Sequence, residues 1–108
     1  MTAYNPVLGL LNSFNQAMVD LEKRLAGAGY HLQRNQICML LLVQAGITRA
    51  THAARFIGVT RQSVHQTIDS LIDAGLVQTE VDRRDRRVRI LSLTDKGAHI
   101  SAVLNVPG

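Results

Sequence analysis

The stretch Val81-Asp82-Arg83-Arg84-Asp85-Arg86-Arg87-Val88-Arg89 is the most informative part of this sequence. It contains five arginines and two aspartates, and it joins two short β-prone runs, residues 76–81 and 88–93. So much charge is unsuited to a core, and the pattern therefore predicts a two-stranded antiparallel ribbon with an exposed arginine tip. We expect such a tip to contact a polyanion.

The segment before this ribbon predicts a helix with one polar face. Thr60 can cap the helix, and Ala74-Gly75 ends it. Apolar residues from Val64 to Ile72 recur at helical spacing and predict a face packed on the core. The opposite face carries Arg61, Gln62, Ser63, His65, Gln66 and Asp69. A capped helix followed by a charged ribbon predicts a winged helix-turn-helix, a mainly α-helical fold with a small β-wing.

Caps and apolar periodicity predict the remaining helices. Asn5-Pro6 begins the first helix, and Gly27 ends it. The second, about 33–44, is apolar almost all round and is expected to form the centre of the core. A short helix over 49–57 follows, and Thr94 caps a last helix that Pro107 stops. We expect an N-terminal helix over 1–30, a winged helix-turn-helix over 31–97, and a short helix and tail over 98–108.

The first predicted helix carries more apolar surface than one domain needs. Its apolar residues form a stripe with alternating spacings of four and three, and two leucines lie beside that stripe. Such a stripe packs either in the core of its own chain or against a second chain. We expect a dimer contact formed by Val7, Leu8, Leu10, Leu11, Phe14 and Met18.

Length and charge fit one small domain with a polyanionic partner. The chain has 108 residues and a formal charge of +4, and five of its twelve Lys and Arg lie within 83–89. The longest apolar run, 37–43, is far shorter than the roughly 18 residues of a membrane span. No secretory signal is recognisable at the N-terminus, and one cysteine fits a reducing compartment. We therefore expect a cytoplasmic protein without membrane contact.

The sequence offers no catalytic or metal-binding pattern. It contains no glycine-rich phosphate loop and no nucleophile with a nearby base, and Asp82 and Asp85 are expected at an exposed tip. The histidines are scattered without ligand spacing. Cys38 lies in the most apolar run, where a core role is favoured over a redox switch. We expect no enzymatic activity and no cofactor.

Several segments, in their order and spacing, resemble the MarR family of bacterial transcription regulators over about residues 32–97. The matching segments are Thr51-His52-Ala53-Ala54-Arg55-Phe56-Ile57-Gly58-Val59-Thr60-Arg61-Gln62-Ser63-Val64, then Leu71, Ala74-Gly75-Leu76-Val77, Asp85-Arg86-Arg87 and Leu93-Thr94-Asp95-Lys96-Gly97, with Leu32 and Gln36 upstream.

The resemblance implies a homodimer on a pseudo-palindromic operator. One reading helix per half-site, carried by Thr60–Gln66, would enter the major groove. The wing, Arg83–Arg87, would reach the flanking minor groove. Family members commonly repress transcription and release DNA when a small-molecule effector binds or a cysteine is oxidised. These residues do not show which trigger applies.

Two departures from the family pattern stand out. The family dimerises through a long C-terminal helical region, whereas this sequence ends eleven residues after Gly97. We therefore expect any dimer to be built differently. The family also often has a basic residue early in the first wing strand, where this sequence has Thr79.

Side-chain chemistry assigns roles within the predicted interface. Arg and Gln can pair with base edges in the major groove, which favours Arg61, Gln62 and Gln66 for base contacts. Groups at a helix start suit phosphate. In the wing, Asp85 is expected to pair with an arginine. The predicted DNA-binding residues are Thr60, Arg61, Gln62, Ser63, His65, Gln66, Arg83, Arg84, Arg86 and Arg87. The alternative is a winged-helix module that pairs with another regulator and does not bind DNA.

Overall fold

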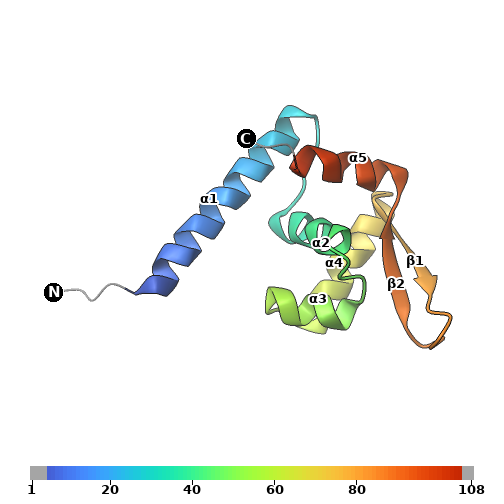
Figure 1. Cartoon of the computed structure of the whole chain (residues 1–108). Coiled ribbons are helices and arrows are strands. Elements are labelled where there is room, and N and C mark those ends of the chain that lie inside the picture. The colour runs from blue at the N-terminus through green and yellow to red at the C-terminus, as the bar shows by residue number, and fades with distance from the viewer. Residues whose placement is uncertain (1–4, 106–108) are drawn as a thin grey trace.

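The computed structural model describes residues 5–105 and has the predicted architecture, helices followed by a small wing and a last helix (Figure 1). The two strands pair antiparallel, from Val77 opposite Leu93 to Val81 opposite Arg89. Element ends predicted from caps, glycines and strand-forming runs agree with the observed ones to within about two residues, while Pro107 lies outside the described residues. The elements are α1 (Pro6–Gly27), α2 (Arg34–Gln44), α3 (Ala50–Ile57), α4 (Arg61–Asp73), β1 (Val77–Val81), β2 (Arg89–Leu93) and α5 (Asp95–Leu104).

The core is built around α2, as its nearly uniform apolar sequence predicts. Ile37, Met39 and Leu40 of this helix are at most 1% exposed. Helices α3, α4 and α5 and strand β2 pack around α2, so that it lies inside the domain. Burial on most sides explains why this segment shows no polar face.

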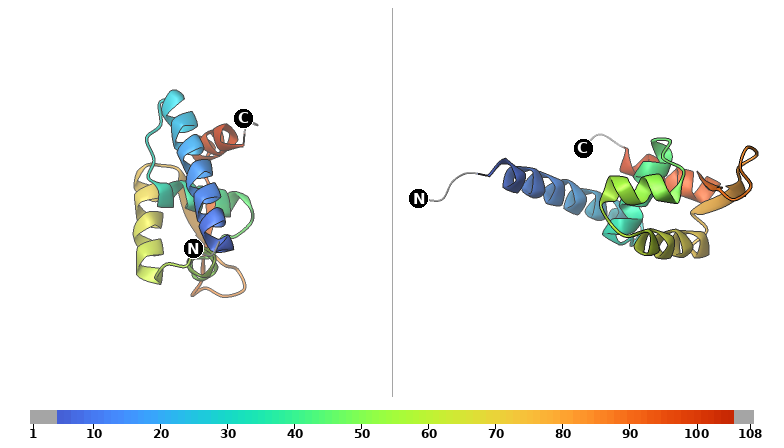
Figure 2. Two further views of the ribbon diagram at one scale, coloured as in Figure 1. Left: turned by 90° about the vertical axis from the view of Figure 1, so that its left-hand side faces the viewer. Right: turned by 90° about the horizontal axis from the view of Figure 1, so that it is seen from below.

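Helix α1 packs on the domain mainly through its C-terminal half. Leu25 is fully buried, whereas the N-terminal half of α1 extends away from the body of the molecule (Figures 1 and 2). The exposed apolar residues on that half are Val7, Leu8, Leu10, Leu11 and Phe14, at 48–70% exposure. Met18 is only 2% exposed and packs in the chain's own core, so its predicted place on a dimer surface is wrong.

The turn from α3 to α4 and the join from α4 to β1 both need a left-handed residue. Gly58 has φ of 80° and Gly75 has φ of 76°, a region that side chains with a Cβ disfavour. Thr60 then caps α4 by accepting a hydrogen bond from the Ser63 N–H at 3.1 Å. These local signals fix where α4 begins and where the chain turns into the wing. No helix within residues 5–105 is long and apolar enough to cross a membrane.

Candidate nucleic-acid interface

Helix α4 presents its predicted polar face at the surface. Its apolar face is anchored by Val64 and Leu71, which are 2% and 0% exposed. A hydrogen bond of 3.1 Å from Gln36 Nε2 to Ser70 Oγ ties α4 to α2. The residues predicted to meet DNA all remain accessible, with only Ser63 half-buried: Thr60, Arg61, Gln62, Ser63, His65 and Gln66. Helix α4 is therefore a fixed element with a hydrogen-bonding outer face.

The arginine tip of the wing, residues 83–87, lies beyond the ends of both strands. Backbone bonds from Asp82 N–H to Val88 O and from Val88 N–H to Asp85 O, both 2.9 Å, close the loop. Arg83, Arg84, Arg86 and Arg87 are all exposed. The N-terminal end of α4 and this tip project toward the same side of the molecule, the lower side of Figure 1 and of the left view of Figure 2.

Asp85 fixes the shape of the tip, as its position among arginines predicts. Its Oδ1 accepts hydrogen bonds of 3.1 Å from the Arg87 N–H and from Arg87 Nε, and Oδ2 accepts one of 3.2 Å from an Arg87 Nη. These bonds to Arg87 hold the pKa of Asp85 below its ordinary value. The remaining tip arginines, 83, 84 and 86, form no ion pair with another described residue, so their charges are available to a ligand.

The prediction that Asp82 lies at the exposed tip is wrong. Asp82 is 6% exposed and forms an ion pair with Arg49, with 2.7 Å between Oδ2 and Nη2. Its Oδ1 accepts a hydrogen bond of 2.8 Å from the Arg84 N–H. Arg49 precedes Asp82 by 33 positions, and nothing in the local sequence signals this contact. Sequence analysis therefore missed a polar contact that ties the wing to the start of α3.

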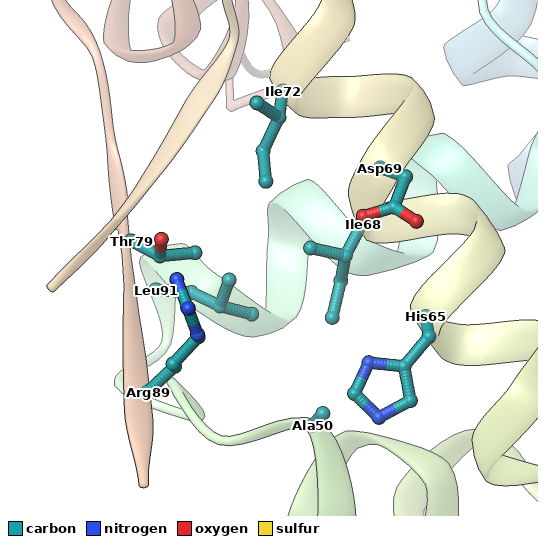
Figure 3. Close-up of a pocket in the computed structure, with 8 residues that line it drawn as sticks. All are labelled: Ala50, His65, Ile68, Asp69, Ile72, Thr79, Arg89 and Leu91. Carbon is teal, nitrogen blue, oxygen red and sulfur yellow. The ribbon is translucent and has the colours of Figure 1, made fainter. Parts of the chain in front are cut away.

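A hollow of about 270 Å³ separates α4 from the wing (Figure 3). Ile72, predicted in the buried face of α4, is 39% exposed and lines this hollow, so its predicted burial is wrong. His65 borders the hollow from the α4 side and Arg89 from the β2 side. The lining residues are Ala50, His65, Ile68, Asp69, Ile72, Thr79, Arg89 and Leu91.

Arg89 adds a cation that the predicted interface omitted. Thr79 pairs with Leu91, two residues after Arg89, so that Arg89 and Thr79 share one face of the ribbon. The Arg89 side chain extends along β2 toward Thr79 (Figure 3). It thus supplies positive charge close to the position where the sequence lacks a basic residue in β1.

Cys38 is half-buried and faces a second, apolar hollow of about 280 Å³. Burial raises the pKa of its thiol, and the nearby Arg34 guanidinium only partly opposes that rise. The hollow is lined by Phe14, Cys38, Leu41, Leu42, Phe56 and Ile57, which come from α1, α2 and α3. Within residues 5–105, no group of three His, Cys, Asp or Glu side chains is arranged to hold a metal ion.

Comparison with known proteins agrees with this geometry. The model of the MarR family matches residues 30–88 of the 108. The chain belongs to the MarR family. This confirms the resemblance over residues 32–88, and it places the chain in a family of winged-helix transcriptional regulators, not of enzymes.

A curated relative and two solved structures cover different shares of the chain. The transcriptional regulator PetP of Rhodobacter capsulatus is 44% identical over 62 residues, which are 57% of this chain and 37% of PetP. The chain therefore matches little more than a third of PetP's length. MarR from E. coli superposes with a TM-score of 0.74 at 19% identity, covering 94% of this chain and 76% of that one. A mutant of MepR from S. aureus, solved bound to an oligodeoxyribonucleotide, has a TM-score of 0.70 at 15% identity, covering 94% and 75%.

Proposed function

We propose that this MarR-family chain is a sequence-specific double-stranded DNA-binding regulator that represses transcription as a homodimer. The observation that carries the proposal is the exposed polar face of α4 beside the arginine tip, both on one side of the molecule. A major groove admits one helix, and an arginine on a hairpin can enter the adjacent minor groove. MepR, solved with an oligodeoxyribonucleotide, supports the use of this fold on DNA.

The proposed contacts divide by chemistry. Arg61, Gln62 and Gln66 read base edges, because their side chains can form paired hydrogen bonds with guanine or adenine. Thr60 and Ser63 lie at the helix N-terminus, which favours phosphate. In the wing, the unpaired side chains of residues 83, 84 and 86 supply cations to the minor groove and its phosphates.

A homodimer is supported by the exposed apolar residues of α1. Val7, Leu8, Leu10, Leu11 and Phe14 form a patch on a helix that projects from the body. Residues 5–19 of this helix and its cap carry no charged side chain, and monomers rarely expose a contiguous apolar patch of this kind. We expect Leu11→Asp to convert dimer to monomer in light scattering. Asn12→Asp introduces the same charge at an exposed neighbour and should leave the mass unchanged.

A small-molecule effector is a further part of the proposal. The hollow beside Cys38 lies between α1 and the DNA-binding helices and is lined almost entirely by apolar side chains. A ligand there would touch both the proposed dimer helix and α3. It could therefore alter the spacing of two reading helices.

The decisive experiment measures binding to duplexes selected from a random pool by the wild-type chain. Arg86→Ala should weaken binding to every duplex and lower the slope of log affinity against log salt by about 0.9 for each subunit of the dimer. Gln62→Ala should instead narrow the gap in binding free energy between selected and random DNA by about 1–3 kcal/mol for each subunit. Lys23→Ala removes an exposed cation of α1, remote from the interface, and serves as the charge control.

Equal affinities for the wild type and both interface variants would contradict these roles. A chain that dimerises but selects no duplex would instead favour the protein-interaction alternative. For the sign of regulation, a reporter gene placed downstream of the selected duplex should fall in expression when the chain is produced. A rise would contradict repression.

A further inference from the structure

We propose that the ion pair between Arg49 and the buried carboxylate of Asp82 positions the arginine tip against α4, and thereby sets how strongly the wing distinguishes DNA flanking the major-groove site. Both residues are positioning residues, since neither is expected to touch DNA. The inference rests on the proposed DNA-binding function, but its structural part can be measured without DNA.

Asp82 holds three parts of the molecule at once. Its Oδ2 accepts from Arg49 at 2.7 Å, and its Oδ1 accepts from the Arg84 backbone N–H at 2.8 Å. Its own N–H donates to Val88 O at 2.9 Å, across the loop. The Asp82 carboxylate therefore joins the N-cap of α3 to the first half of the tip, and the Asp82 backbone closes the base of the loop against Val88, the residue before β2.

The burial of the Asp82 carboxylate distinguishes this contact from an ordinary surface ion pair. The Asp82 side chain is 9% exposed and that of Arg49 is 43% exposed. Exposed pairs contribute little, but removing the partner of a desolvated carboxylate leaves a buried charge without compensation. Separating Arg49 from Asp82 would therefore cost free energy, and this cost keeps the two side chains in contact.

A second hydrogen bond, formed by Thr48 next to Arg49, attaches the ribbon to the same connection at another point. The Leu91 N–H donates to Thr48 O at 2.8 Å, so the connection before α3 holds β2 through residue 48 and the loop through residue 49. An isolated two-stranded ribbon is at best marginally stable and free to twist. Two attachments on consecutive residues restrict that freedom and fix the ribbon relative to α3 and α4.

Fixing the ribbon matters because the two proposed DNA contacts must be made together. The distance from α4 to the tip must match the distance from the major groove to the flanking minor groove. A freely moving wing could still neutralise phosphate, but would lose part of the preference for the narrow minor groove of A·T-rich flanks. The pair Arg49–Asp82 should therefore affect discrimination between flanks more than discrimination at the bases read by α4.

The first test follows tryptic cleavage, since trypsin cuts after arginine and the tip consists largely of arginines. Asp82→Asn and Arg49→Met should each raise cleavage within residues 83–87 about tenfold, measured relative to cleavage at Lys23 in α1 of the same chain. Global unfolding would raise both rates and leave the ratio unchanged. Glu80→Gln, which removes an exposed carboxylate of β1, should leave the ratio at the wild-type value.

Coupling between the two residues gives a sharper result. The double variant Arg49→Met with Asp82→Asn should raise the cleavage ratio no more than the stronger single variant, because both substitutions remove one interaction. Multiplying effects in the double variant, or wild-type ratios in both single variants, would overturn the proposal. Arg49→Met changes a partly exposed side chain and keeps the test readable if Asp82→Asn fails to fold.

The DNA part compares one selected duplex carrying A·T flanks with the same duplex carrying G·C flanks. In both single variants, the ratio of affinity for the A·T-flanked duplex to affinity for the G·C-flanked duplex should be at least threefold smaller than in the wild type. The loss of affinity on changing a base read by α4 should stay within twofold of its wild-type value. An unchanged flank ratio would overturn the inference. A wild type that binds no duplex would defeat the proposed function, yet the tryptic result would still show whether the pair orders the tip.

Discussion

Replacing Gly97 by alanine should destabilise the fold although the position is helical. Gly97 lies in the first turn of α5, and a Cβ built there would lie 1.9 Å from the carbonyl oxygen of Leu76. Ordinary van der Waals contact begins at 3.4 Å, so the first turn of α5 and the start of the wing would have to separate by about 1.5 Å. The close approach depends on the absence of a side chain.

The cost of that separation is larger than the helix-forming advantage of alanine. Thr94 N–H donates to Leu76 O at 3.1 Å, and Thr94 Oγ1 accepts from Gly97 N–H at 3.0 Å. Overpacking costs about 1–3 kcal/mol, and weakening a hydrogen bond adds about 1 kcal/mol. Alanine regains about 1 kcal/mol of helix propensity. The net loss is about 2 kcal/mol, which corresponds to a fall in Tm of roughly 10 °C.

Urea and thermal unfolding followed by circular dichroism measure this loss directly. Gly27→Ala is the matched control, because a Cβ at the end of α1 would meet nothing within 4 Å. That substitution should leave stability unchanged or raise it by about 0.5 kcal/mol. Equal stability of the two variants, or a Gly97→Ala variant as stable as the wild type, would refute the steric reasoning.

Three further predictions concern single side chains. Thr60→Ala removes the cap of α4 and should cost about 1 kcal/mol in urea unfolding, whereas Thr60→Asn should restore most of it; equal losses would contradict the cap. Because Arg87 lowers the pKa of Asp85 below its ordinary value of 3.8, the hydrogen bonds of the Asp85 carboxylate should still be present at pH 3.8 and be lost only at lower pH. The NMR shift of the Arg87 amide follows this loss, and a transition above pH 3.8 would contradict the prediction. Because burial raises the pKa of Cys38 above 9.0, iodoacetamide alkylation should reach half its maximal rate only above pH 9.0, and a midpoint near neutrality would contradict the assignment.

Much of the fold was readable from local patterns. Thr60, Gly75 and Thr94 mark element ends through caps and a left-handed turn, which depend on neighbouring residues alone. The apolar run of α2 predicts a central helix, because a helix buried on most sides needs no polar face. The charged stretch 82–88 predicts a hairpin tip, since it separates two strand-forming runs.

The misplaced residues are those whose surroundings come from distant parts of the chain. Met18 follows the same helical spacing as Phe14, yet the first is buried in the core and the second is 48% exposed beside an open hollow, because the body of the domain covers α1 only in part. Ile72 matches the buried face of α4 by spacing but lies where the wing leaves a hollow. Helical periodicity specifies a face, whereas the extent of its coverage depends on neighbouring elements.

The amino-acid sequence by itself determined the order of helices and strands, the polar face of α4 and the charge of the tip, because propensity, capping and charge are properties of adjacent residues. Only the tertiary structure decided that Asp82 is buried against Arg49 and that α4 and the tip share one side. The first depends on an approach between residues 33 positions apart, and the second on how α4 and the ribbon pack against the rest of the domain. The packing of α2, α4 and the ribbon fixes such approaches, and no local pattern encodes them.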